Sequence, residues 1–161
     1  MHADSWRRNY RGAYDDHFLD HDVDADRLAV WTARLGVPGP SGRACTVVAE
    51  HDGAVVGFAH TIFGEDPAWG SLLDNLHVSH ALQRQGIASR LMACTAERLL
   101  AAGGGRALYL WVLEQNTGAQ AFYRARGGSV VERAVRPLAG GGDGPVLRIA
   151  WPDAATLVLP G

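Results

Sequence analysis

The 161-residue chain contains no lysine, because its fifteen basic residues are all arginines. A lysine nucleophile or Schiff base is therefore excluded. Cysteine is almost as scarce. Cys45 and Cys94 stand far apart, and this spacing supports neither a disulfide framework nor a thiolate zinc site. We predict a protein without a metal site in a reducing, cytoplasmic environment.

Long apolar segments are also missing. The first ten residues are polar, and no run approaches the roughly eighteen apolar residues that a membrane-spanning helix needs. The net charge is −2 at pH 7 and the isoelectric point is near 6.4, so the chain lacks the positive field of a general nucleic-acid binder. We expect neither a membrane nor a nucleic acid among its partners.

Composition and length favour one folded domain. Hydrophobic residues make up 47% of the chain and charged residues 20%, which is ordinary for a globular protein. A chain of 161 residues can bury one full hydrophobic core but not two. We therefore predict a single domain over residues 1–161.

The spacing of apolar residues predicts helices and strands along the chain. Residues 5–35 carry aromatic and leucine side chains at three- to four-residue intervals, typical of two short helices, and residues 36–42 are too rich in proline and glycine to continue them. The order of the elements predicts an α/β or α+β fold with a central mixed sheet. The remaining predicted elements are a hairpin over 44–63, strands over 70–78, 107–113, 130–136 and 146–151, and helices over 86–101 and 116–126.

The segment that joins strand 70–78 to helix 86–101 has the features of an anion site. The first amides of a helix lack intrahelical partners and carry the positive end of the helix dipole, so they bind phosphate. Gly86 allows a close approach, Ala88 keeps the next turn small and Arg84 adds a cation. The alternative interpretation is a strand-to-helix turn with a glycine kept for packing. The segment matches neither a Walker loop nor a Rossmann glycine motif.

Two blocks of sequence resemble the GNAT family of N-acetyltransferases. The segment Gln83-Arg84-Gln85-Gly86-Ile87-Ala88 is similar to the family's acetyl-CoA signature, Gln/Arg-x-x-Gly-x-Gly/Ala, between a strand and a helix. The second block comprises residues 110–116, which end in Glu-Gln-Asn, and residues 121–127, which begin Ala-Phe-Tyr. Two blocks in the family's order are more specific than either alone, and the resemblance extends from about residue 44 to residue 151.

The resemblance implies a single GNAT-like domain whose mixed, mostly antiparallel sheet has two central strands that splay apart. The pantetheine arm of acetyl-CoA, the expected cosubstrate, would lie between these strands. Residues 44–151 are then the sheet and the acetyl-CoA-binding core, and residues 1–35 form a helical region on the acceptor side. The residues expected to contact the cosubstrate are Leu76, His77, Val78, Gln83, Arg84, Gln85, Gly86, Ile87, Ala88, Asn116, Phe122 and Tyr123.

The N-terminal region departs from the family's pattern. Members usually begin with a strand, whereas residues 5–10 already resemble the end of the first helix. Either the start of the chain is assigned downstream of the true one, or the sheet lacks an edge strand that another segment or a second copy covers. A second copy would make the protein a homodimer. Gly128 also stands where the family usually has Phe, which removes an aromatic packing group.

Acetyl transfer needs a proton for the departing thiolate and a base for the amine. The resemblance implies that Tyr123 is the general acid, although a helix tyrosine is otherwise typical of a core residue. His77 and Glu114 are the two candidate bases, and a lone strand histidine is more often structural. Strand alternation predicts that Asn75 and His77 share one face while Asp74 points to the other.

Six aspartates and two histidines lie within residues 15–26. A calcium loop that starts at Asp20 would place Ala25 where glycine is needed and Trp31 where a bidentate glutamate belongs, so we reject that interpretation. The alternatives are an acidic rim that attracts a cationic amine and a solvated helix surface. Aromatic residues at helical spacing either wall the acceptor pocket or belong to the core; they are Trp6, Tyr10, Tyr14 and Trp31.

These observations predict an acetyl-CoA-dependent N-acetyltransferase that acts on a primary amine of a small molecule or a peptide. One alternative is a non-catalytic CoA-binding sensor or regulatory domain. A weaker one is a protein-interaction domain with a degenerate loop. Only the enzyme would release CoA in response to an added amine.

Overall fold

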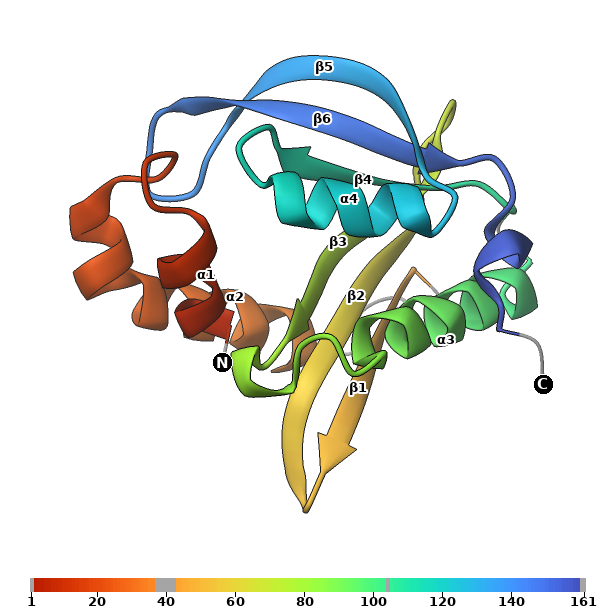
Figure 1. Cartoon of the computed structure of the whole chain (residues 1–161), viewed down its shortest axis with the longest axis horizontal. Helices are drawn as coiled ribbons and strands as arrows, with labels where there is room; N and C mark the ends of the chain where they lie inside the picture. Colours follow the sequence, from red (N-terminus) through yellow and green to blue (C-terminus); the bar gives the residue numbers. More distant parts are fainter. Residues whose placement is uncertain (1, 37–42, 104, 160–161) are drawn as a thin grey trace.

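The computed structural model describes residues 2–36, 43–103 and 105–159, so most of the predicted loop, residues 37–42, lies outside it. Six strands form one sheet in the order β1-β2-β3-β4-β6-β5 (Figure 1). The strands are β1 (Ala44–His51), β2 (Ala54–Asp66), β3 (Gly70–Val78), β4 (Leu108–Leu113), β5 (Ser129–Pro137) and β6 (Asp143–Trp151). The helices are α1 (His2–Asn9), α2 (Val23–Gly36), α3 (Ile87–Ala101) and α4 (Thr117–Ala125), with short turns η1 (Phe18–Asp22), η2 (His80–Leu82) and η3 (Ala154–Leu157).

The sheet has the predicted mixed, mostly antiparallel arrangement within a single α/β domain. Only β3 and β4 pair in parallel, and the other four neighbouring pairs are antiparallel. β1 is an edge strand, and no strand precedes it among the described residues. None of the helices in the described part of the chain has the length and apolar character needed to cross a membrane.

The two faces of β3 are covered by different helices. α3 and α4 share a hydrophobic core with one face, to which Leu91 of α3 and Leu108 of β4 contribute. Leu76 and Val78 pack against this core, whereas His77 between them contacts α1. Because side chains alternate along a strand, one face of β3 belongs to α3 and α4 and the other to α1.

The N-terminal region folds as three helical segments rather than the predicted two. η1 is a turn of π-helix that leads directly into α2. The Asp15 carboxylate accepts a hydrogen bond from the Phe18 N–H at 2.9 Å at the start of this turn. Phe18 and Leu19 are buried with Trp6 in a small second core. Apolar spacing carries no signal for a π-helical turn, so the sequence does not predict it.

β3 and β4 run together for only a short distance. They pair at Ser71 with Leu108 and at Leu72 with Tyr109, and no further pair of the two strands is formed. The Ser71 N–H also donates to the Ala107 C=O at 3.0 Å. The predicted splay of the two central strands therefore begins directly after Leu72.

A β-bulge in β3 lies just beyond this pairing. His60 of β2 is opposite Asn75 and Thr61 is opposite Leu73, so Asp74 between them has no partner. An extra residue of this kind bends its strand and increases the local twist. The bulge therefore turns the rest of β3 away from the line of β4.

A substitution at Gly70, at the start of β3, can test how closely β3 approaches β4. Gly70 and Gly53 both have positive φ, +81° and +74°, but a Cβ at Gly70 would lie 2.5 Å from the Ala107 oxygen while one at Gly53 would meet nothing within 4 Å. We expect Gly70→Ala to lower the free energy of unfolding by about 3 kcal/mol and Gly53→Ala by about 1 kcal/mol, since only the first adds a clash to the backbone strain. Urea unfolding measures both. Equal losses would contradict a tight approach of β3 to β4.

Candidate active site

The opening between β3 and β4 is bordered on the β3 side by backbone groups that do not face β2. The Ser79 N–H donates to the Val56 C=O of β2 at 2.7 Å. In an antiparallel pair every second residue forms hydrogen bonds with the neighbouring strand. His77 is two residues before Ser79, so its N–H and C=O groups also face β2. Leu76 and Val78 consequently direct their N–H and C=O groups toward β4.

β4 presents matching groups from the other side. The Glu114 N–H donates to the Pro145 C=O of β6 at 3.0 Å. The same alternation then turns the backbone groups of Trp111 and Leu113 toward β3. The opening thus has hydrogen-bond donors and acceptors along both walls. An extended chain with amide groups can pair with such walls much as an added strand does.

The loop after β3 places the start of α3 beside this opening (Figure 1). Arg84 and Gly86 have positive φ, +65° and +80°. The first hydrogen bond into α3 runs from the Arg90 N–H to the Gly86 C=O at 3.1 Å, and no side chain caps the helix at Gly86. The amides of residues 86–89 therefore have no intrahelical partner, which is the arrangement that binds phosphate.

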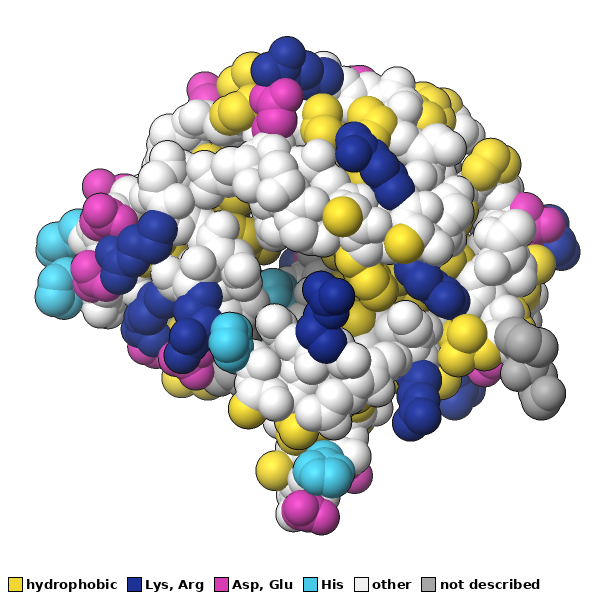
Figure 2. Space-filling view, in the orientation of Figure 1, with side chains coloured by type: hydrophobic (Ala, Val, Ile, Leu, Met, Phe, Trp, Pro, Cys, Tyr) yellow, Lys and Arg dark blue, Asp and Glu magenta, His cyan; other side chains and the backbone are white. Residues whose placement is uncertain are grey.

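Figure 2 shows the surface hollowed between α4 and the loop that follows β3, with basic side chains at the rim. We call this hollow, together with the opening between β3 and β4, the cleft. A pocket between α1 and the same loop adjoins it and is lined by Val78, Ser79 and Gln83 on one side and by Ser5 and Asn9 on the other. Val78 of β3 and Gln83 of the loop, both predicted to contact the cosubstrate, therefore line one pocket.

α4 carries the remaining predicted cosubstrate residues. The Asn116 side-chain oxygen accepts a hydrogen bond from the Ala119 N–H at 3.1 Å, so Asn116 caps α4 as predicted. Phe122 is half-buried and packs against the main core, 5.3 Å from Tyr123 between ring centroids. Gln120 ties the start of α4 to β4 by donating to the Glu114 C=O at 2.7 Å.

Tyr123 is buried, with 9% of its surface exposed, and its ring lies edge-on to Trp151 at 6.1 Å. Within the described part of the chain its hydroxyl has no hydrogen-bond partner. Burial raises the pKa of Tyr123 above its ordinary value, so the phenol is protonated at neutral pH. The pKa of Tyr10 is also raised, by burial first and then by Tyr14 and Tyr123.

The ring of His77 lies beneath α1. Its Nδ1 atom is 3.0 Å from the Ser5 hydroxyl, and its centroid is 4.3 Å from that of His2 and 5.3 Å from that of Phe58. Burial, and to a lesser extent the charge of Arg27, lowers the pKa of His77 to about 4. His77 is therefore neutral at pH 7 and is a weak proton acceptor.

Two further histidines occupy the same layer. His2 accepts a hydrogen bond from the Trp31 indole N–H at 2.9 Å, and its Nε2 atom is buried with no partner in the described chain. Burial, followed by the charge of His77, lowers the pKa of His2 to about 2. His60 lies 2.8 Å from the Thr46 hydroxyl, and its pKa is also lowered by burial. The interface between α1, α2 and the sheet thus holds three neutral imidazoles.

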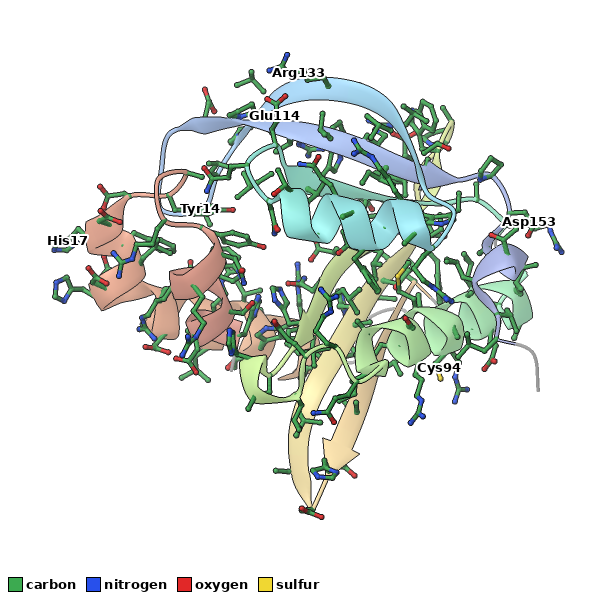
Figure 3. All side chains as sticks on the ribbon, viewed as in Figure 1. Tyr14, His17, Cys94, Glu114, Arg133 and Asp153 are labelled. Carbon is green, nitrogen blue, oxygen red and sulfur yellow. The ribbon has the colours of Figure 1, made fainter. Side chains whose placement is uncertain are left out.

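Glu114, the second predicted base, is engaged by an arginine. Its carboxylate lies 2.7 Å from the Arg133 guanidinium of β5, and the two side chains meet above the sheet in Figure 3. This ion pair directs the carboxylate toward β5. Neither His77 nor Glu114 therefore stands unengaged in the cleft.

Arginines neutralise much of the acidic segment over residues 15–26. Arg11 pairs with Asp16 at 2.9 Å and also with Asp20, and Arg7 pairs with Asp24. These pairs favour a balanced helix surface over a free acidic rim. Of the four aromatic residues predicted to wall a pocket or join the core, Trp6 is buried in the small second core, with Tyr10 and Tyr14 packed against it and Arg27 stacked on it at 4.1 Å. Trp31 instead contacts Phe58 and His60 of β2.

The sequence predicts the wrong face of β3 for Asp74. Regular alternation predicts that Asp74 points away from His77, and this prediction is wrong because the bulge interrupts the alternation. The Asp74 carboxylate lies 2.7 Å from Arg34 of α2, on the face that His77 occupies. Its negative charge also raises the pKa of His77, against the larger effect of burial. An irregularity in pairing leaves no mark on apolar spacing, so no sequence signal could have placed it.

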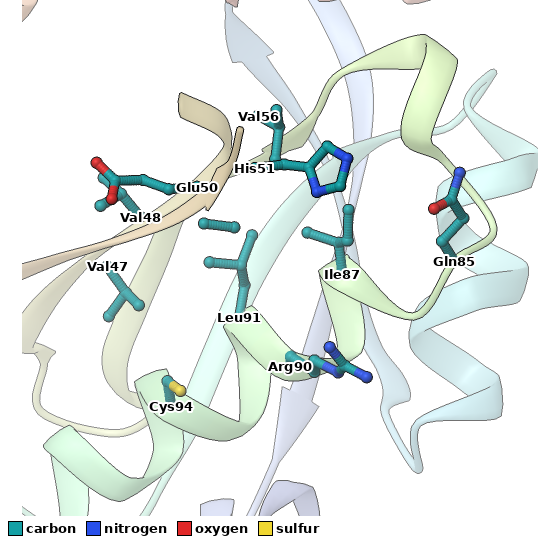
Figure 4. Close-up of a pocket in the computed structure, with 11 residues that line it drawn as sticks. Val47, Val48, Glu50, His51, Val56, Gln85, Ile87, Arg90, Leu91 and Cys94 are labelled. Carbon is teal, nitrogen blue, oxygen red and sulfur yellow. The ribbon is translucent and has the colours of Figure 1, made fainter. Parts of the chain in front are cut away.

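A separate groove lies between β1 and α3 (Figure 4). It approaches the loop before α3 at Gln85 and the start of α3 at Ile87, but β1 forms its opposite wall, so it is distinct from the cleft. The residues that line it are Val47, Val48, Ala49, Glu50, His51, Val56, Gln85, Ile87, Arg90, Leu91 and Cys94. Among the described residues, no group of three or more His, Cys, Asp or Glu side chains is placed to hold a metal ion.

Comparison with known proteins relates the chain to acetyltransferases. The sequence model of the Acetyltransferase (GNAT) family matches residues 3–127. A search of curated protein sequences found no match. Three solved structures have similar folds at 16–18% identity. A putative GNAT acetyltransferase from Desulfovibrio desulfuricans has a TM-score of 0.63 and 18% identity, with 94% of this chain and 92% of that chain covered.

The other two structures contain bound ligands. The PaiA N-acetyltransferase from Thermoplasma acidophilum, in complex with coenzyme A, has a TM-score of 0.61 at 16% identity and covers 91% of this chain and 86% of its own. The putative acetyltransferase YncA from Salmonella typhimurium, with its cofactor acetyl-CoA, has a TM-score of 0.58 at 18% identity and covers 81% and 73%. At these identities the comparisons establish a shared fold.

The buried histidines make stability depend on pH. His2 and His77 have pKa values of about 2 and about 4 in the folded chain against 6.5 when exposed, so the unfolded chain takes up protons that the folded chain does not. We expect the free energy of unfolding to fall below pH 6.5 by up to about 1.4 kcal/mol per pH unit for each histidine. Urea unfolding between pH 7 and pH 5 measures this slope. The slope should be smaller in His77→Gln, and an identical slope in that variant would contradict the assignment.

Proposed function

Because the chain belongs to the Acetyltransferase (GNAT) family, we propose that it is an acetyl-CoA-dependent N-acetyltransferase that acetylates a primary amine of a small molecule or a peptide. The observation that carries this proposal is the cleft, in which a strand pair with free backbone groups adjoins the uncapped start of α3. Coenzyme A has the matching chemistry, because it joins an extended arm with two amides to a diphosphate. The ligands of the PaiA and YncA structures support the same choice.

In this proposal the diphosphate binds the amides at the start of α3. Gln83, Arg84 and Gln85 approach it from the loop, Arg84 with its charge, and Gly86, Ile87 and Ala88 offer backbone N–H groups. The pantetheine arm pairs with Leu76 and Val78, while His77 contributes only its place in the strand. Asn116 and Phe122 contact the arm from α4. The thioester then lies toward the bulge, since the arm runs back along β3 from the loop.

The reaction is the transfer of an acetyl group from sulfur to nitrogen. The neutral amine attacks the thioester carbon, its nitrogen forms the new C–N bond, and the C–S bond breaks. A backbone N–H of β3, that of Val78 or Leu76, stabilises the negative charge on the carbonyl oxygen without reorganising. Tyr123 donates its phenolic proton to the departing thiolate and regains one from solvent. The amine loses its extra proton to water in the cleft.

The weakness of the two predicted bases favours an acceptor amine with a low pKa, which loses its proton easily. His77, with a pKa of about 4, is a weak acceptor for the proton of a strongly basic amine, and the Glu114 carboxylate is already paired with Arg133. An α-amine with a pKa near 8 is partly neutral at pH 7, whereas a lysine amine costs about 5 kcal/mol to deprotonate. We therefore propose that deprotonation is assisted by His77 or Glu114 through water and that the acceptor carries a weakly basic amine.

The engagement of both bases also favours a second candidate, a CoA-binding sensor without turnover. The two functions differ in one measurable property. Detection of free thiol distinguishes them, because the enzyme releases CoA at a rate that depends on the added amine and the sensor does not.

The diphosphate site is tested at Gly86. We expect Gly86→Glu to abolish acetyl-CoA binding in calorimetric titration, because the carboxylate repels the phosphates, while Gly86→Gln, of equal size, retains part of the affinity. Gly64→Glu is the matched control, since Gly64 also has positive φ, +59°, and open space around it on β2. Acetyl-CoA affinity that is the same in all three variants would refute the site.

The general acid is tested at Tyr123. We expect Tyr123→Phe to lower kcat by about 100-fold or more with little change in acetyl-CoA affinity, because the hydroxyl acts on the leaving thiolate. The hydroxyl takes part in no hydrogen bond within the described part of the chain, so the substitution should fold normally. Tyr109→Phe is the control, since Tyr109 is equally buried and its side chain packs with Arg148 instead. Undiminished turnover in Tyr123→Phe would place the acid elsewhere.

A further inference from the structure

The sheet has two edge strands, β1 and β5, and they differ in charge. β5 carries three charged residues, Glu132, Arg133 and Arg136, and ends with Pro137. Charges and proline on an edge strand prevent another strand from pairing with it. Residues 44–49 of β1 contain no charged residue, no proline and no glycine. Of the two described edges, only that of β1 is therefore open to another strand.

The outer edge of β1 has backbone groups available for pairing. The Phe63 N–H of β2 donates to the Arg43 C=O at 2.8 Å. In an antiparallel pair every second residue forms hydrogen bonds with the neighbouring strand, so alternate residues from Arg43 to Ala49 face β2. The residues between them turn their N–H and C=O groups to the outer edge, where no described strand pairs with them; they are Ala44, Thr46 and Val48.

The side chains along this edge are small or apolar on both faces. On one face, Val47 and Ala49 pack against the main core and line the groove between β1 and α3 (Figure 4). On the other face, Val48 is 53% exposed, close to Thr46. A strand that pairs with β1 must therefore carry small or apolar side chains on both of its own faces. β1 itself has this pattern.

The two ends of β1 carry opposite charges. Arg43 directly precedes the strand and Glu50 lies near its end. Both side chains are exposed, and neither forms an ion pair within the described part of the chain. If two copies of β1 pair antiparallel, each Arg43 lies near the Glu50 of the other copy, whereas a parallel pair would bring like charges together. Charge complementarity therefore favours a second copy as the partner, in the antiparallel orientation.

We propose that the chain forms a homodimer in which β1 pairs antiparallel with β1 of a second copy, so that the two sheets become one. The register that uses the whole strand is centred on Val47, with Arg43 opposite His51 and Thr46 opposite Val48 of the other copy. Thr46 and Val48 then form hydrogen-bonded pairs, and Val47 faces its own counterpart at a non-hydrogen-bonded position. This interface does not depend on the proposed function, because it lies outside the cleft.

Sedimentation equilibrium of the full chain tests the dimer. We expect a mass of about twice 17.2 kDa at micromolar concentration. Val48→Lys should raise the dissociation constant of the dimer about 100-fold, because it places a charge in the middle of the shared edge. Val135→Lys is the matched control, since Val135 is a 69% exposed valine on the other edge strand, and its dissociation constant should stay close to that of the unaltered chain. A chain that remains monomeric at high micromolar concentration, or an equal effect of both substitutions, would overturn the proposal.

Charge reversal tests whether the partner is a second copy in the antiparallel orientation. Arg43→Glu should weaken the dimer about tenfold, because each new carboxylate lies near the Glu50 of the other copy. Adding Glu50→Arg to the same chain reverses both charges and should restore the original dissociation constant. A double variant that is as weak as Arg43→Glu alone would contradict this arrangement.

Disulfide cross-linking tests the register. In a Cys45→Ser, Cys94→Ser background, Val47→Cys should give a covalent dimer on oxidation with copper–phenanthroline, since facing residues at a non-hydrogen-bonded position have Cα atoms about 4.5 Å apart, within the range of a disulfide. Thr46→Cys in the same background is the control, because Thr46 faces Val48 rather than its own counterpart, and it should remain uncross-linked. Equal yields from the two variants would refute the register and with it the proposed pairing.

Discussion

The separation of β3 from β4 after two residue pairs is the constraint on which the site depends. Backbone N–H and C=O groups in the interior of a sheet normally pair with a neighbouring strand, and leaving them unpaired is costly. Here the walls of the cleft, formed by Leu76 and Val78 on β3 and by Trp111 and Leu113 on β4, keep these groups available. The fold can carry this cost because the strands are anchored on their other edges, β3 to β2 and β4 to β6.

The same strand that forms one wall of the cleft also leads into the loop before α3. The chain leaves β3 at Val78, passes the turn η2 and enters α3 at Ile87, so the start of the helix is fixed relative to the free backbone groups. Gly57 supports this placement. A Cβ at Gly57 would lie 3.2 Å from Leu91 and 3.4 Å from Ile87, so the absence of a side chain on β2 allows α3 to pack closely across the sheet.

The sequence predicts those parts of the molecule whose conformation is determined by residues close together in the chain. Asn116 caps α4 because an asparagine oxygen can reach an amide three residues ahead, and the turn before α3 ends at Gly86, whose positive φ a glycine adopts easily. The π-helical turn, the bulge at Asp74 and the pairing of Glu114 with Arg133 depend on contacts between distant segments. Apolar periodicity does not report such contacts, so the orientations of the candidate bases could not be predicted.

The bulge also explains how β3 can present apolar side chains on one face and polar side chains on the other. Along its regular part, Leu76 and Val78 face the apolar core beneath α3, while His77 faces the polar and aromatic layer beneath α1. A strand without a bulge would keep an aspartate at position 74 on the α3 side, where an unpaired carboxylate in an apolar core would be strongly destabilising. The extra residue instead moves the charge to the face where Arg34 can pair with it. The bulge thus helps to separate the two walls of the cleft. It also keeps Asp74, the only carboxylate in the described residues of β3 and β4, on the side of α1 and α2.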